Sequence, residues 1–247
     1  MNTAVSIDSV KEVSPKTKAR FVGIFFLLTM VGGIVAEGFI SGSLIVAGDA
    51  AATAKNILTN ETLFRTGFAV YIIEMACQVV MTVLFYDLLK PISRTLARVS
   101  LFLNISGIVI KTMSRLFYIV PVLILSDATY LNSFTTEQTQ SMAMLSLAVN
   151  NEGPVIGLVF FGFAGLLEAY LILKSTFLPR FLGVIGILAN AGWLLFLYPP
   201  FAYRLFPFIA GIAFLGAIAQ IFWLLVFGVN EERWKEKAAA SANSIWR

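Results

Sequence analysis

The chain has 247 residues, of which 58% are hydrophobic and only 13% are charged. Soluble domains carry about twice that share of charged residues, so the composition excludes an ordinary water-soluble globule and predicts a membrane protein. Histidine is absent and there is one cysteine. These counts exclude a Ser-His-Asp hydrolase, histidine-ligated haem and an intramolecular disulfide, and they argue against most zinc sites.

The chain begins with a polar segment, residues 1–18, which we expect to be a disordered leader. A first apolar helix is predicted from about Ala19 to Ile40. Cleavage by signal peptidase after Ala36 would place Ile34 at the −3 position, where a small residue is preferred. We therefore expect an uncleaved first membrane helix.

The segment Val46–Arg65 is less apolar than its neighbours. Asp49 is placed to accept backbone N–H groups at the start of an alanine-rich helix, and this helix is too short and polar to cross a membrane. We expect it to lie at the outer interface. A second membrane helix is predicted from about Leu63 to Leu89, ending before Pro91, and a third from about Leu96 to Leu125.

The second half of the chain predicts three more membrane helices and one further surface helix. The partly apolar segment Thr135–Val149 is helical in pattern, and we expect it to be a second short interfacial helix. The remaining apolar runs are long enough to cross a hydrocarbon core of about 30 Å. They cover about Pro154 to Leu173, Phe181 to Tyr198 and Pro207 to Val229, and a charged tail, residues 230–247, follows.

Lysine and arginine are concentrated on one side of this topology. They occur in the leader, in the turn after the second helix, in the loop after the fourth helix and in the tail, whereas the other side has Lys55, Arg65 and Arg204. The positive-inside rule therefore predicts that both termini are cytoplasmic. The fold class we predict is an all-α polytopic bundle, residues 19–229, with six membrane helices and two short outer interfacial helices.

Several charged side chains fall inside the predicted helices. Glu74 and Gln78 lie near mid-depth in the second helix, and Lys111 and Arg115 lie near mid-depth in the third. An unpaired charge at the bilayer centre costs about 2.5–3.5 kcal/mol or more. We therefore expect Glu74 to pair with Lys111 or Arg115, and Glu37, at the outer end of the first helix, to approach Arg115.

These charges have two interpretations. They form an ion-pair network that only fixes helix packing, or they line a polar cavity that holds a ligand, an ion or a lipid head group. Glu168 and Asp87 are predicted nearer the cytoplasmic face, where Arg180, Lys174 or water could meet them. An intramembrane hydrolase is not expected, because Glu37 or Glu74 would have to activate water without histidine.

Several motifs give the chain a family resemblance. The first half contains GGIVAEGF, GDAAATAKNIL, LFRTGF and FYDLLKPISR, and the second half contains LVFFGF, LPRFLGVIGILANAGWL and GVNEERW. With these motifs the chain resembles the bacterial membrane family called domain of unknown function 4386, from about Ala19 to Trp234. The resemblance implies a six-helix fold without an assigned reaction. Its motif positions include Glu37, Asp49 and Arg65, which modestly favours a site that faces outward.

The sequence therefore predicts a multi-pass protein of the bacterial cytoplasmic membrane that is not an enzyme. The leading hypothesis is a protein that binds or transports a small anionic or lipid-like ligand in a polar intramembrane pocket. The alternative is a non-catalytic accessory or structural subunit of a larger membrane complex. We expect membrane lipids as partners, with a membrane protein or a second copy as further candidates, and no nucleic acid, cofactor, metal site or catalytic residue. The candidate ligand-binding residues are Glu37, Arg65, Glu74, Gln78, Lys111 and Arg115.

Overall fold

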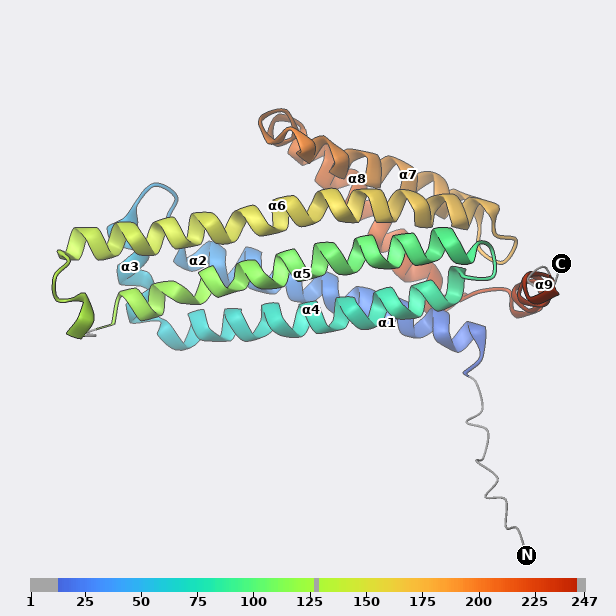
Figure 1. Cartoon of the computed structure of the whole chain (residues 1–247), viewed down its shortest axis with the longest axis horizontal. Helices are drawn as coiled ribbons and strands as arrows, with labels where there is room; N and C mark the ends of the chain where they lie inside the picture. The colour runs from blue at the N-terminus through green and yellow to red at the C-terminus, as the bar shows by residue number, and fades with distance from the viewer. Residues whose placement is uncertain (1–12, 127–128, 244–247) are drawn as a thin grey trace, which may run out of the picture.

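A computed structural model describes residues 13–126 and 129–243 as a bundle of helices with no strand in those ranges. Six helical segments are long and apolar enough to cross a membrane, which confirms the predicted fold class. Figure 1 shows that the long helices run roughly along one axis. The spans are α1 with the π-helix η1 and α2 (Pro15–Gly33, Ile34–Ser41, Gly42–Leu44), α4 (Glu61–Leu89), α5 (Arg94–Ile124), α6 (Thr136–Lys174), α7 with the 3₁₀-helix η3 (Arg180–Leu194, Leu195–Leu197) and α8 (Pro199–Val226).

The bundle has two chemically different ends. At one end α1 starts, α4 ends and α9 (Glu231–Asn243) follows α8. We call it the basic end, because Lys16, Lys90, Arg94, Lys174 and Arg180 lie there, at the starts and ends of these helices. At the opposite end, the short helix α3 (Ala50–Thr59) packs mainly against α6 (Figure 1).

Side-chain caps begin several of these helices. The carboxylate of Asp49 accepts a hydrogen bond of 2.8 Å from the backbone N–H of Ala52, as predicted for α3. Ser93 accepts from the N–H of Leu96 at the start of α5. Thr135 and Gln138 form a capping box at the start of α6.

The fourth span differs from its predicted boundary. We expected a separate surface helix at Thr135–Val149 and a membrane helix from Pro154, but α6 runs without a break from Thr136 to Lys174. The polar residues that suggest a break lie inside the bundle instead. Asn150 is 2% exposed, and its side-chain oxygen accepts a hydrogen bond from Arg115. One expected interfacial helix, α3, is therefore separate, and the other is the first part of α6.

Other helix ends also differ from the sequence boundaries. Helix α8 begins at Pro199, eight residues before the expected start, since proline is well accommodated in the first turn of a helix. Helix α1 begins at Pro15, and the tail forms α9. The expected disordered leader and the end of the tail fall largely on residues 1–12 and 244–247, which lie outside the described residues.

Close helix packing holds the centre of the bundle together. A Cβ atom on Gly107 of α5 would lie 2.6 Å from the ring of Phe161 and 3.1 Å from the carbonyl oxygen of Gly157, both on α6. Helix α8 meets α1 near the basic end, where a Cβ on Gly23 would lie 2.9 Å from Leu225, but Gly33 has nothing within 4 Å. The half of the bundle away from the basic end is therefore less tightly closed between α1 and α8.

Candidate functional site

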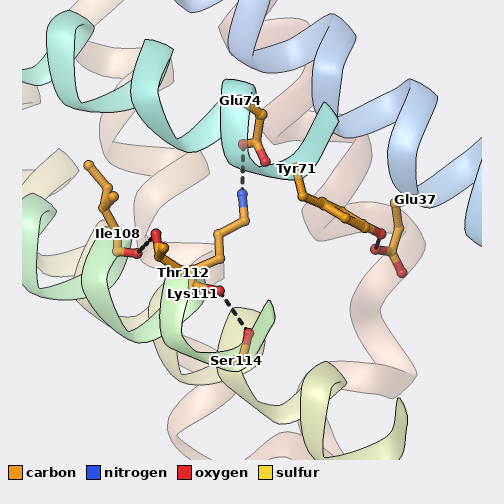
Figure 2. A network of polar contacts seen from close by, with 7 residues as sticks. All are labelled: Glu37, Tyr71, Glu74, Ile108, Lys111, Thr112 and Ser114. Carbon is orange, nitrogen blue, oxygen red and sulfur yellow. Dashed lines mark hydrogen bonds and ion pairs between the residues drawn. The ribbon is translucent and has the colours of Figure 1, made fainter. Parts of the chain in front are cut away.

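An ion pair joins the middles of α4 and α5. The Nζ atom of Lys111 donates to Oε1 of Glu74 at 2.7 Å, and the two side chains are 17% and 3% exposed (Figure 2). The short turn between α4 and α5 makes them antiparallel neighbours and brings these positions to the same depth. We expected Glu74 to pair with Lys111 or Arg115, and the partner in the structure is Lys111. The second oxygen of Glu74, Oε2, is buried without a hydrogen-bond partner among the described residues.

Tyr71 connects the other two charged residues. Its hydroxyl donates to Oε2 of Glu37, as Figure 2 shows, and the guanidinium carbon of Arg115 lies 3.8 Å from the centre of its ring. Among the described residues no ion pair links Glu37 directly to Arg115. The expected approach of Glu37 to Arg115 is therefore indirect, because Tyr71 lies between them and contacts both side chains.

Arg115 is almost completely buried, with 2% of its surface exposed. One guanidinium nitrogen, Nη1, donates to Oδ1 of Asn150 at 3.0 Å. Its Nε atom is buried and has no partner within residues 13–126 and 129–243. Asn150 was not predicted as a site residue, because the run Asn-Asn-Glu-Gly-Pro resembles a helix end. A buried arginine needing a neutral acceptor on the facing helix is the signal that could have identified it.

The π-helix η1 carries Glu37 on the first span. Ser41, at the end of η1, makes hydrogen bonds of 3.0 Å and 3.3 Å to the hydroxyl groups of Tyr71 and Tyr118. Segments of π-helix are rare and are often found at functional sites. Just before η1, a Cβ on Gly32 would lie 3.2 Å from Cβ of Glu74, so this glycine lets the first span approach the ion pair.

These side chains border a cavity of about 420 Å³, which we call the charged cavity. All six spans contribute residues to its lining. One part of the lining is polar and the other is apolar and aromatic, and the volume is in the range typical of small-molecule sites. The polar part comprises Glu37, Tyr71, Glu74, Lys111, Arg115 and Asn151, and the apolar part includes Leu158, Phe161, Trp193, Phe196 and Phe206.

Two of the six predicted site residues are not in this cavity. Arg65 lies on the exposed surface of α4, with its side chain 54% exposed, and its Nε donates to Glu61 one turn earlier at 2.7 Å. Gln78 lies closer to the basic end and borders a different cavity. The structure therefore brings together Glu37, Glu74 and Lys111 with Arg115, and it separates Arg65 and Gln78 from them.

Metal binding of the usual kind finds no support at this site. Among the described residues, no group of three or more His, Cys, Asp and Glu side chains lies close enough to hold a metal ion. A larger hollow of about 740 Å³ lies on the surface beside α3, and Lys55 is the charged residue of its described lining. The charged cavity remains the place where buried charges of both signs meet.

The spans and the charged cavity together define a polytopic helical membrane protein with a polar site inside the bundle. More specifically, the chain belongs to the family described as Domain of unknown function (DUF4386), whose family model matches residues 21–228 and so most of the chain. No significant match was found among curated proteins or among solved structures. The family description assigns no activity, so function has to be argued from the cavity itself.

Proposed function

We propose that the protein binds, and passes through the membrane, a small amphipathic molecule with an anionic head group, which is held in the charged cavity. The observation that carries this proposal is the pair of buried polar atoms left without partners at the site, Nε of Arg115 and Oε2 of Glu74. A buried polar atom without a hydrogen bond destabilises a fold by about 1–3 kcal/mol. An ion-pair network built only for packing would be expected to satisfy both atoms.

The two parts of the cavity lining suit the two parts of such a molecule. Arg115 and Lys111 can form charge-assisted hydrogen bonds to a carboxylate or phosphate oxygen. The aromatic and leucine side chains opposite them, Phe161, Phe206 and Leu158, provide an apolar surface for a hydrocarbon portion. A cavity of about 420 Å³ has room for a single short chain rather than a complete diacyl lipid.

Glu37 favours a head group that also carries a positive charge. Its side chain is exposed, whereas Glu74 is buried and its Oε1 atom already accepts from Lys111. With two acidic and two basic residues around the cavity, a purely anionic head group must compete with Glu37, but a zwitterionic head group can pair with both signs. We therefore propose a zwitterionic amphiphile as the preferred ligand, and a simple carboxylate as a weaker one.

The concentration of lysine and arginine at the basic end supports a cytoplasmic location for that end and for both termini. Glu37 and Tyr71 then lie in the outer half of the membrane, so the charged cavity is loaded from the outside or from the outer leaflet. We propose a bacterial cytoplasmic-membrane protein that binds rather than chemically changes its ligand.

Native mass spectrometry on gently purified protein is the first test. We expect a single bound small molecule per chain, which is absent from the Arg115→Met and Lys111→Met variants. Added lysophosphatidylethanolamine should bind more tightly than laurate, and Glu37→Gln should reduce that preference. Arg65→Met is the matched control, because Arg65 lies outside the cavity and its removal should leave binding unchanged.

Two results would contradict the proposal. The first is wild-type protein that carries no small molecule and binds neither probe. The second is a stable stoichiometric protein partner in place of a ligand, which would favour the accessory-subunit hypothesis. In that case the four charges would serve helix packing alone.

A further inference from the structure

A second cavity of about 250 Å³ lies closer to the basic end. It adjoins the charged cavity, because Leu158, Phe161 and Trp193 line both. Its polar residues come from the other five spans, whereas the first span contributes Val22 and Phe26. We call it the oxygen-lined cavity, and its polar lining consists of Gln78, Thr82, Asn104, Glu168, Asn190 and Gln220.

Glu168 gives this cavity one negative charge. Its Oε1 atom accepts hydrogen bonds of 2.8 Å from both Ser100 and Asn104. Within residues 13–126 and 129–243, its Oε2 atom has no hydrogen-bond partner and no Lys or Arg nitrogen within 4.0 Å. The expected contact of Glu168 with Lys174 or Arg180 does not form, because the side chain faces the bundle interior.

The described lining contains no lysine or arginine to balance this carboxylate. Asp87, the other acidic residue expected near this face, has two: Lys90 at 2.7 Å and Lys18 at 3.8 Å. Glu168 lies six residues before the end of α6, about 9 Å along the helix axis. An uncompensated carboxylate inside the bundle is costly, so a positive charge from outside the chain would stabilise this cavity.

Two further oxygen atoms help to distinguish a proton from a bound cation as the charge that balances Glu168. Gln78 and Thr82 lie one turn apart on α4 and are 9% and 3% exposed. The side-chain oxygens Oε1 of Gln78 and Oγ1 of Thr82 are buried without partners among the described residues. Thr82 and Glu168 also border the same narrow void, together with Ser100. A proton on Glu168 would neutralise the carboxylate and supply one hydrogen-bond donor, so at least one of these two oxygens would remain unsatisfied.

We infer that the oxygen-lined cavity is a binding site for a monovalent inorganic cation, held by Glu168 with Gln78 and Thr82. A hard cation prefers carboxylate, amide and hydroxyl oxygens, and all three types are present. One carboxylate matches one positive charge, whereas divalent sites normally use more carboxylates or keep a full set of waters. The volume leaves room for waters that complete the coordination.

This inference does not depend on the amphiphile proposed for the charged cavity. Its test is the thermal unfolding of the full chain in phosphatidylcholine nanodiscs at constant ionic strength. Sodium, potassium or lithium chloride replaces N-methylglucamine chloride stepwise, and no amphiphile is added. A cation that binds only the folded state raises Tm in a saturable way. We expect that rise for at least one of these small cations.

Variants test whether the cation dependence of Tm arises from the oxygen-lined cavity. Glu168→Gln should abolish the dependence of Tm on the cation, whatever its effect on baseline stability. Thr82→Val and Gln78→Leu should raise the half-saturating concentration about tenfold, the effect of losing one ligand of a charged group. Glu61→Gln is the control, because this exposed carboxylate pairs with Arg65 far from the cavity and its loss should not change the response.

Three results would overturn the inference. Equal Tm values in all chloride salts would exclude a selective site. A cation response that persists in Glu168→Gln would place the ion elsewhere. A Tm that depends on pH through Glu168 but on no cation would mean that a proton neutralises the carboxylate.

Discussion

The carboxylate of Glu74 and the ammonium group of Lys111 lie 2.7 Å apart at the middle of α4 and α5. Both are shielded from water, so removing either partner leaves the other as an uncompensated buried charge. We expect Glu74→Gln and Lys111→Met each to lower the free energy of unfolding by about 3–5 kcal/mol. The double variant should lose much less than the sum, because it buries no unpaired charge.

Denaturation in mixed micelles of sodium dodecyl sulfate measures these differences. The matched control is the exposed pair of Arg65 and Glu61, also at 2.7 Å, whose removal should cost about 1 kcal/mol or less. If the single variants at Glu74 and Lys111 cost no more than this control, the pair does not hold the two spans together.

Tyr71 should contribute separately through its hydroxyl group and its ring. Tyr71→Phe removes the donor to Glu37 and the contact with Ser41, for an expected loss of about 1 kcal/mol. Tyr71→Leu also removes the ring beside Arg115, and a desolvated cation–π contact adds about 2 kcal/mol. The same denaturation assay applies. Tyr170→Leu is the control, because Tyr170 is exposed and its contact with Lys174 is longer, at 5.6 Å.

The pattern of apolar runs was enough to predict the six spans, since crossing a membrane fixes the length and composition of each helix. Depth and a short turn were enough to predict that Glu74 pairs with a basic residue of the third span, but they left Lys111 and Arg115 as alternatives. The π-helix at Glu37 and the hydrogen bond from Arg115 to Asn150 were not predicted, because both depend on which helix faces which. The continuity of α6 was missed for the same reason.

Gly107 tests how closely α5 and α6 are packed. The Cβ of Gly107→Ala would lie 2.6 Å from the ring of Phe161 and 3.1 Å from the carbonyl of Gly157. Overpacking of this kind costs about 1–3 kcal/mol. Gly211→Ala, on the exposed side of α8, meets nothing within 4 Å and should be neutral or stabilising by up to about 1 kcal/mol. A thermal-unfolding ranking with Gly107→Ala at or above Gly211→Ala would contradict this packing.

The orientation proposed from the basic end can be measured with single cysteines. In a Cys77→Ser background, Lys55→Cys places a thiol on α3 and Ala239→Cys places one on α9, and both positions are exposed. A membrane-impermeant maleimide added to intact cells should label the cysteine at position 55 and should reach position 239 only after lysis. Labelling in the reverse order would invert the topology and place the charged cavity in the inner half of the membrane.

Acid should weaken the contact between the start of helix α9 and the start of α1. The hydroxyl of Ser14 and the backbone N–H of Lys16, with the charges of Lys235 and Lys16, hold the pKa of Glu231 below its ordinary value of 4.5. A carboxyl group with a lowered pKa stabilises the docked state above about pH 4.5, and this contribution is lost as pH falls through the lowered pKa. A spin label on Ala239→Cys should therefore become more mobile below pH 4.5. Glu231→Gln should remove this transition, whereas Glu236→Gln, at an exposed position of the same helix, should keep it.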